Sequence, residues 1–333
     1  MEKLHIPKPI SCGIFLTYRC SAICRHCVYA SSPKWSSDFL DKKNVEILLK
    51  LLSKWLPKSS YITFNAGIHF SGGEPFLNFD LLVEFIKIAK NYNIFPVLVE
   101  TNCFWAKDKQ TSIKKLSQLK SAGLDGILLS INPFVIEYVK LKNIKIAYET
   151  SLEIFGYSGV ILYQDIFYEI LQKSNISSIL KFEEFIQKFG HTPLKYMELL
   201  PMGRATYKLQ NLFKKYPKET FFHENCLKEF QNPYHIHIDN YGNYIPSFCA
   251  GISLNNIFET KEPLDVNLKE KPIISALCKS LEELYYIAKQ FNYQQKSQGY
   301  ISKCDLCLDI RKQIISKTDE FKELTPKDYY YNL

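Results

Sequence analysis

The chain has 333 residues, of which 46% are hydrophobic and 23% charged, a balance typical of a folded globular protein. The formal net charge of +8 comes mainly from lysines spread along the chain, so no basic stripe favours nucleic-acid binding. No apolar run approaches the length of a membrane span, and the first residues carry no secretory signal. We therefore expect a cytoplasmic protein that binds neither nucleic acid nor membrane.

Ten cysteines are many for a cytoplasmic protein and few for a disulfide scaffold of this length. Cys20, Cys24 and Cys27 form a C-x3-C-x2-C spacing directly after the apolar run at residues 14–17. Three thiols this close suit neither a disulfide pair nor a closed four-cysteine zinc site. Three thiolates can hold three irons of a cubane iron–sulfur cluster and leave the fourth iron open. This loop is therefore the first candidate metal site.

Strand-like and helix-like patterns alternate through the first two thirds of the chain. We expect strands at residues 13–17, 67–70, 95–99, 126–131, 159–163 and 196–200, and helices at 41–56, 79–92, 112–122, 143–155 and 182–189. This alternation predicts an α/β fold of parallel βαβ units, a partial (β/α)6 TIM-like barrel over residues 1–205. Functional sites on such sheets lie at the carboxyl ends of the strands.

The alternation stops at about residue 206. A hairpin-like stretch at residues 235–245 is followed by a helical pattern at 280–291 and by a C-x2-C spacing at Cys304 and Cys307. We predict a second, smaller domain over residues 206–333, an α+β fold rich in cysteine. We see no repeats and no low-complexity linker, so we expect this second part to pack against the barrel.

The second motif is Ser-Gly-Gly-Glu-Pro at residues 71–75, where the second expected strand ends. Gly72 and Gly73 allow a close backbone approach to a ligand, and Glu74 can accept hydrogen bonds from an ammonium group. The alternative is a plain turn in which Pro75 begins the next segment. One βα unit after the three cysteines, however, the motif resembles the Gly-Gly-Glu motif of the radical S-adenosylmethionine (radical SAM) superfamily. In that family it contacts the amino group of the methionine part of SAM.

The resemblance implies further SAM contacts at polar residues that follow the expected strands. They are Thr101, Asn102, Ser130 and Asn132 for the methionine part and the ribose, and Met202 and Gly203 near the adenine. The last two stand in a Pro-Met-Gly-Arg-Ala stretch similar to a family motif. The family often has an acidic residue at the position of Asn132, which puts the ribose contact there in doubt. Each of these residues is otherwise a polar loop residue at a strand end.

The stretch that ends at Cys249 resembles the turn-and-cysteine element of SPASM and twitch domains, which bind auxiliary [4Fe–4S] clusters. The resemblance implies that Cys226, Cys249, Cys304 and Cys307 hold one such cluster. A structural zinc on the same four cysteines is the alternative, because the ligands alone do not separate zinc from iron. Another alternative is that Cys226 is a free thiol that donates a hydrogen atom to the substrate.

The remaining cysteines, Cys12, Cys103 and Cys278, have no metal-binding spacing and are expected to be structural, although Cys103 follows Asn102 at the expected site. His26, beside Cys27, is expected to pack on the cluster.

The resemblance implies an enzyme that reductively cleaves SAM to a 5′-deoxyadenosyl radical, which removes a hydrogen atom from the substrate. It also implies an electron donor such as flavodoxin or ferredoxin. Similar enzymes with one auxiliary cluster epimerise or cross-link ribosomally made peptides, and a peptide is the substrate we expect. About a dozen residues precede the first expected strand, so we expect no separate N-terminal peptide-recognition domain. The alternatives are a step of small-molecule or cofactor biosynthesis and a non-catalytic iron–sulfur or zinc-binding scaffold.

Overall fold

The computed structural model describes residues 2–36, 38–174 and 176–333. Its backbone forms two compact units. The sheet unit comprises Ile10–Cys24 and Ser31–Leu199, and the cysteine-rich unit comprises Met1–Pro9, Arg25–Ala30 and Leu200–Leu333. The cysteine loop contributes to both, because Cys20 and Cys24 belong to the first unit and Cys27 to the second. The domain boundary after residue 205 stays a prediction.

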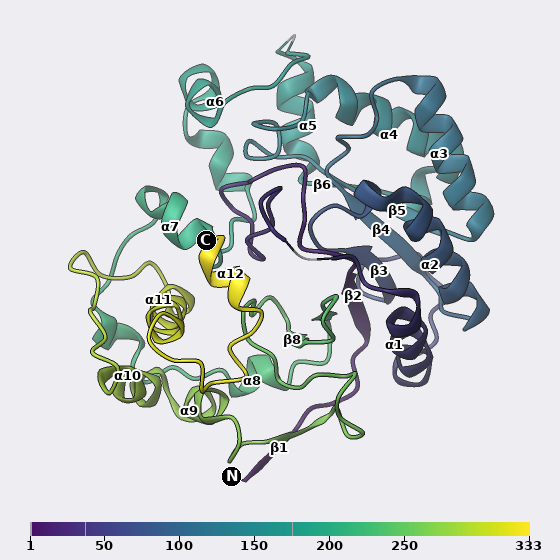
Figure 1. Cartoon of the computed structure of the whole chain (residues 1–333). Coiled ribbons are helices and arrows are strands. Elements are labelled where there is room, and N and C mark those ends of the chain that lie inside the picture. Colours follow the sequence, from purple (N-terminus) through teal and green to yellow (C-terminus); the bar gives the residue numbers. More distant parts are fainter. Residues whose placement is uncertain (1, 37, 175) are drawn as a thin grey trace. The chain divides into compact units, whose positions relative to one another are not determined.

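The sheet unit is built on five parallel strands (Figure 1). They are β2 (Ser11–Phe15), β3 (Gly67–Ser71), β4 (Val97–Thr101), β5 (Gly126–Ser130) and β6 (Val160–Tyr163). Each strand pairs in parallel with the next one along the chain, giving the order β6-β5-β4-β3-β2. The predicted α/β class with a parallel sheet is confirmed. All carboxyl ends of these strands meet at one edge of the sheet, which is where the motifs fall.

Helices connect these strands, as crossover connections between parallel strands require (Figure 1). The connecting helices are α1 (Lys42–Trp55), α2 (Phe79–Asn91, preceded by the 3-10 turn η1, Pro75–Asn78), α3 (Lys109–Ala122) and α4 (Leu141–Phe155, followed by η2, Tyr157–Gly159). Two more helices, α5 (Asp165–Gln172) and α6 (Phe182–Phe189), follow β6. Helix α1 is capped by Asp41, whose carboxylate accepts the Asn44 N–H at 2.9 Å. The helix buries Val45, Leu48, Leu49 and Leu52, one apolar face at helical spacing.

The sixth expected strand, at residues 196–200, is wrong. The segment begins inside a 3-10 turn, η3 (Thr192–Tyr196), and has no strand hydrogen bonds afterwards. Pro193 fixes the backbone of that turn, and Tyr196 is 68% exposed. A strand of a covered parallel sheet must bury both faces, which this segment does not do. The sheet unit therefore has five parallel strands in its described residues, and α5 was not anticipated.

The cysteine-rich unit combines short strands and helices. Its strands are β1 (Lys3–His5), β7 (Ile236–Ile238), β8 (Tyr244–Pro246) and β9 (Asp265–Asn267), and β1 pairs antiparallel with β9. Its helices are α7 (Ala205–Lys208), α8 (Leu227–Phe230), α9 (Pro272–Lys279), α10 (Leu281–Lys289), α11 (Lys303–Ile315) and α12 (Lys327–Tyr331), with 3-10 turns η4 (Gln210–Leu212) and η5 (Lys218–Phe221). Helix α11 is the buried element of this unit, and α10 packs along it.

The predicted hairpin is present as β7 and β8, paired antiparallel. Asp239 organises its turn, because one carboxylate oxygen accepts the backbone N–H groups of Tyr241 and Asn243 at 3.0 and 2.9 Å. Gly242 completes the turn at a φ of 85°. Among the described residues, no helix combines the length and the apolar character that crossing a membrane requires.

Candidate functional site

The Gly-Gly-Glu turn is joined to the start of the cysteine loop. The Gly73 N–H donates to the Thr17 carbonyl at 2.7 Å, and the Glu74 N–H donates to the Arg19 carbonyl at 2.9 Å. A Cβ at Gly73 would overlap the Arg19 carbonyl, and one at Gly72 would overlap the Thr17 carbonyl. The close approach of the two backbone segments therefore explains why glycine occupies both positions. One of the contacts is with Arg19, the residue directly before Cys20.

The Glu74 carboxylate is fully buried and holds the loop after β4. One oxygen accepts the Thr101 hydroxyl at 2.8 Å and the Phe76 N–H at 3.2 Å, and the other accepts the Asn102 N–H at 2.8 Å. Burial raises the pKa of Glu74 to about 7, even though these hydrogen bonds act to lower it. In this structure Glu74 orders the neighbouring loop, and its direct contact with the amino group of SAM stays a prediction.

Asn102 connects this loop to the cysteine loop. Its side-chain amide donates to the Ser21 hydroxyl at 3.0 Å and to the Cys20 sulfur at 3.6 Å. Its carbonyl oxygen accepts the Phe104 N–H at 3.0 Å, which fixes the amide orientation. Two motifs that are eighty residues apart in the sequence thus meet at Cys20.

Sequence analysis missed Glu100, on β4, which lies among polar side chains at the strand ends. The Ser71 hydroxyl at the end of β3 donates to the Glu100 carboxylate at 2.9 Å, and Ser130 at the end of β5 also hydrogen-bonds to it. Burial raises the pKa of Glu100, and both hydrogen bonds oppose that effect. The only sequence signal was a carboxylate inside the otherwise apolar run Val-Leu-Val-Glu-Thr.

Asn132, a predicted ribose contact, caps the turn that follows β5. Its side-chain oxygen accepts the N–H groups of Phe134 and Val135 at 3.0 and 3.1 Å, and its side chain is 1% exposed. Thr101 is equally buried and also accepts the Trp105 indole N–H at 3.0 Å. Both residues therefore have structural partners here, and their SAM contacts stay predictions.

In the cysteine-rich unit, the Pro-Met-Gly-Arg-Ala stretch packs on the segment that carries Cys27. The Arg204 N–H donates to the Cys27 carbonyl at 3.0 Å, and a Cβ at Gly203 would overlap the backbone of Val28. Burial, assisted by the nearby Arg204 charge, lowers the pKa of His26 to about 4, so this imidazole is neutral. Met202 and Gly203 are thus placed beside the loop of the third cysteine.

A second contact of this segment runs toward Cys249. The Tyr29 hydroxyl lies 3.0 Å from Nδ1 of His237 on β7, and the same nitrogen lies 2.8 Å from the Ser247 carbonyl. Burial holds the pKa of His237 well below its usual value, so the ring is neutral. These contacts fix the loop that leads from β8 to Cys249.

The four C-terminal cysteines come from separate elements of this unit. Cys226 precedes α8, Cys249 follows β8, and Cys304 and Cys307 lie in the first turns of α11, three residues apart and therefore on one face. The four thiols are close enough to interact electrostatically. Burial is the main cause that raises the pKa of Cys226, and the other three sulfurs raise it further. Burial first, and then the sulfurs of Cys249 and Cys307, raise the pKa of Cys304 to about 12. The structure therefore gathers all four predicted ligands.

The chemistry of the donors bears on which metal the four cysteines fit. Four thiolates are the ligand set of a closed structural zinc site. They are also the common donor set of a cubane iron–sulfur cluster. The four cysteines therefore fit a [4Fe–4S] cluster, and zinc is the alternative for the same ligands.

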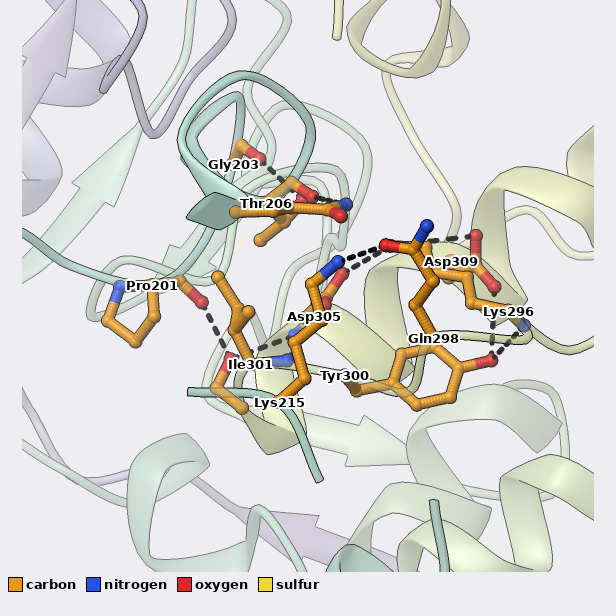
Figure 2. Close-up of polar contacts among 12 residues, drawn as sticks. Pro201, Gly203, Thr206, Lys215, Lys296, Gln298, Tyr300, Ile301, Asp305 and Asp309 are labelled. Carbon is orange, nitrogen blue, oxygen red and sulfur yellow. Dashed lines mark hydrogen bonds and ion pairs between the residues drawn. The ribbon is translucent and has the colours of Figure 1, made fainter. Parts of the chain in front are cut away.

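The start of α11 is fixed by a buried ion pair (Figure 2). The Asp305 carboxylate, 1% exposed, accepts the Lys296 ammonium at 2.6 Å and the Ile301 N–H at 3.0 Å. The Ser302 hydroxyl accepts the Asp305 N–H and donates to the Pro201 carbonyl at 2.7 Å. This cap holds the helical turn that carries Cys304 and Cys307, so the two thiols are preorganised.

The other cysteines have packing roles in this structure. Cys12 and Cys103 are fully buried, the latter at a φ of 68° with its N–H on the Thr101 hydroxyl, and Cys278 lies partly exposed at the end of α9. Burial holds the pKa of Cys103 well above its usual value. None of the three lies among the gathered ligands.

Residues 14–157 match the family model described as "Radical SAM superfamily". This segment contains all three cysteines of the first motif and the Gly-Gly-Glu turn. The chain is also similar to "Putative peptide biosynthesis protein YydG" of Bacillus subtilis (strain 168), with 30% identity over 139 residues. That match covers 42% of this chain, and the chain spans about two fifths of the length of this relative, 41%.

Several solved structures resemble the chain. BtrN in complex with AdoMet and 2-DOIA aligns with a TM-score of 0.40 and 12% identity over 83% of this chain and 89% of the other. Native anSMEcpe with bound AdoMet aligns with a TM-score of 0.45 and 12% identity over 92% and 97%. SuiB of Streptococcus suis aligns with a TM-score of 0.35 and 13% identity over 77% and 64%.

Proposed function

We propose that this protein reductively cleaves SAM to methionine and a 5′-deoxyadenosyl radical, which removes a hydrogen atom from a substrate. One arrangement carries the proposal: the loop of Cys20 is joined by backbone hydrogen bonds to the Gly-Gly-Glu turn and by Asn102 to the loop after β4. These residues lie within the segment that matches the radical SAM family model. A non-catalytic scaffold does not account for this arrangement, because it would not need to hold SAM.

Each residue then has a stated task. A [4Fe–4S] cluster on Cys20, Cys24 and Cys27 supplies the electron that splits the sulfonium of SAM. Glu74 holds Thr101 and Asn102 in place, and Asn102 donates to the Cys20 sulfur. Ser130, with Met202 and Gly203, is proposed to contact the remainder of SAM. The electron comes from a low-potential donor such as flavodoxin or ferredoxin.

We propose further that Cys226, Cys249, Cys304 and Cys307 hold a second [4Fe–4S] cluster. Two observations support this proposal: all four cysteines belong to one compact unit, and Cys307, Cys249 and Cys304 all act electrostatically on Cys226. Cys226 is 8% exposed and lies close enough to the other three cysteines for each to act on its pKa, which favours a ligand over a hydrogen-atom donor.

A ribosomally made peptide is the proposed substrate, modified by epimerisation or cross-linking. The support is the similarity to a relative named for peptide biosynthesis. Peptides encoded by short reading frames beside the gene can be incubated with enzyme, SAM and reductant in D2O. Epimerisation incorporates one deuterium per site, whereas a cross-link removes two hydrogens. Deoxyadenosine formation without a mass change in any of these peptides would point to a small-molecule substrate.

The cofactor assignment is tested by anaerobic iron and sulfide analysis with electron paramagnetic resonance (EPR). We expect about eight irons in the wild type and about four in a Cys20→Ala/Cys24→Ala/Cys27→Ala variant. Only the wild type should form 5′-deoxyadenosine after reduction with SAM, and Cys278→Ala, the control, should match it. A wild type with four irons and bound zinc would support the SAM-cleaving activity and would show that zinc, not a second cluster, occupies the four C-terminal cysteines. A wild type with no iron and no deoxyadenosine would refute the proposal.

A further inference from the structure

Arg311 is buried beside the four gathered cysteines. It lies on α11 one turn after Cys307 and is 4% exposed. Its Nη1 donates to the Ala250 carbonyl at 3.0 Å and to the Tyr330 hydroxyl at 3.0 Å. The Tyr330 hydroxyl in turn donates to the Gly251 carbonyl at 2.5 Å. Arg311 thus fastens the two residues that follow Cys249 to the helix that carries Cys307.

The guanidinium is not fully satisfied by these bonds. Its Nε–H is buried and finds no hydrogen-bond partner in residues 2–36, 38–174 and 176–333. A buried donor on a charged group without an acceptor costs roughly 1–3 kcal/mol or more, so native proteins rarely leave one. Such a donor indicates an acceptor that joins the protein later.

The surrounding charges identify the kind of acceptor. Burial acts to lower the pKa of Arg311, and interactions with Tyr330, Cys307 and Cys249 outweigh it and hold that pKa above its usual value. The same guanidinium acts to lower the pKa of Cys249, which burial raises to about 11. Arg311 therefore lies beside Tyr330 and beside two of the proposed cluster ligands, Cys307 and Cys249, whose sulfurs become negatively charged when they bind a metal.

We infer that Arg311 is a positioning and charge-compensating residue for the auxiliary cluster, with its unpaired Nε–H available to a sulfur of that site. The inference rests on the proposed function of the four cysteines. A [4Fe–4S] cluster on four thiolates carries one more negative charge when reduced than when oxidised. A buried, permanently charged guanidinium stabilises the more negative state, so Arg311 raises the reduction potential.

The experiment is a redox titration followed by EPR in the Cys20→Ala/Cys24→Ala/Cys27→Ala background, where the auxiliary cluster is the one that remains. Arg311→Met should lower the potential so that the ratio of reduced to oxidised cluster at a fixed potential falls at least tenfold, equal to 59 mV for one electron. Arg311→Lys, which keeps the charge, should change that ratio less than threefold. Lys312→Met removes a charge from the next position of α11 and should also change it less than threefold.

The outcomes separate the two levels of the proposal. Zinc, or no iron, in the background protein would overturn the auxiliary cluster itself. Four irons with an unchanged potential in Arg311→Met would overturn the role of Arg311 and leave the cluster in place. If Arg311→Met remains folded but loads no iron, Arg311→Lys decides: normal loading and potential support charge compensation. Loss of iron in both would reduce Arg311 to a structural clamp and overturn the inference.

Discussion

The two candidate metal sites are built in opposite ways. The first takes its cysteines from eight consecutive residues, and its surroundings are fixed by backbone hydrogen bonds and a buried acid, Glu74. The second takes four cysteines from positions spread over about eighty residues, and its surroundings include a buried cation, Arg311. A local motif needs precise neighbouring backbone, whereas a dispersed ligand set needs a packed unit to bring it together. The predictions below probe this difference.

The largest effect is expected from Gly73→Ala. The added Cβ would overlap the backbone carbonyl of Arg19, which cannot move without displacing the loop of Cys20. We expect loss of about four of eight irons and of deoxyadenosine formation, measured by iron analysis and product assay. Gly156→Ala is the matched control, because its φ is 70° and no atom lies within 4 Å of its Cβ. It should keep all irons and lose about 1–3 kcal/mol of stability, because its φ of 70° and ψ of 175° are nearly restricted to glycine. Equal iron content in the two variants would contradict the backbone account.

Cys226→Ala tests the dispersed site with the local one intact. Removing one of four ligands should release about four irons and leave the EPR signal of the SAM-binding cluster. SAM cleavage to deoxyadenosine should persist at low turnover, because the sheet unit is untouched, while conversion of substrate should fall. If Cys226→Ala instead keeps eight irons and loses only the product, the cysteine is a hydrogen-atom donor and three ligands suffice.

Glu74→Gln addresses the buried acid. The pKa of Glu74 is about 7 in the folded protein, above its ordinary value of 4.5. The folded state therefore binds the proton more tightly, so stability is greatest below about 4.5 and is lost as pH rises through 7. Across that window the wild type should lose roughly 1.4 kcal/mol per pH unit, measured by anaerobic urea unfolding. Glu74→Gln should flatten this slope, and an unchanged slope would show that Glu74 does not titrate there.

The sequence predicted local features better than features that depend on side chains from several elements. The five parallel strands of the sheet unit and its helices α1, α2, α3, α4 and α6 follow from local apolar periodicity, whereas α5 was not anticipated. The expected strand at residues 196–200 failed because periodicity does not reveal whether both faces are covered. Glu100 and Arg311 were missed because their roles depend on contacts with side chains of other elements. Glu100 accepts a hydrogen bond from Ser71, and Arg311 donates one to Tyr330. Single charged residues in apolar segments were the available signal.

The smallest expected effect concerns the amide of Asn102. Its hydrogen bond to the Cys20 sulfur, at 3.6 Å, stabilises the more negative, reduced form of the SAM-binding cluster. Asn102→Ala should lower the potential of that cluster, with at most a tenfold change in the reduced fraction at fixed potential, measured by EPR titration without SAM. Asn143→Ala is the control, because that amide donates to the Phe104 carbonyl at 3.0 Å in the same loop without touching a cysteine. A neutral amide should shift its cluster less than the charged Arg311 shifts the other. The reverse order would mean that hydrogen bonding to sulfur, and not buried charge, sets both potentials.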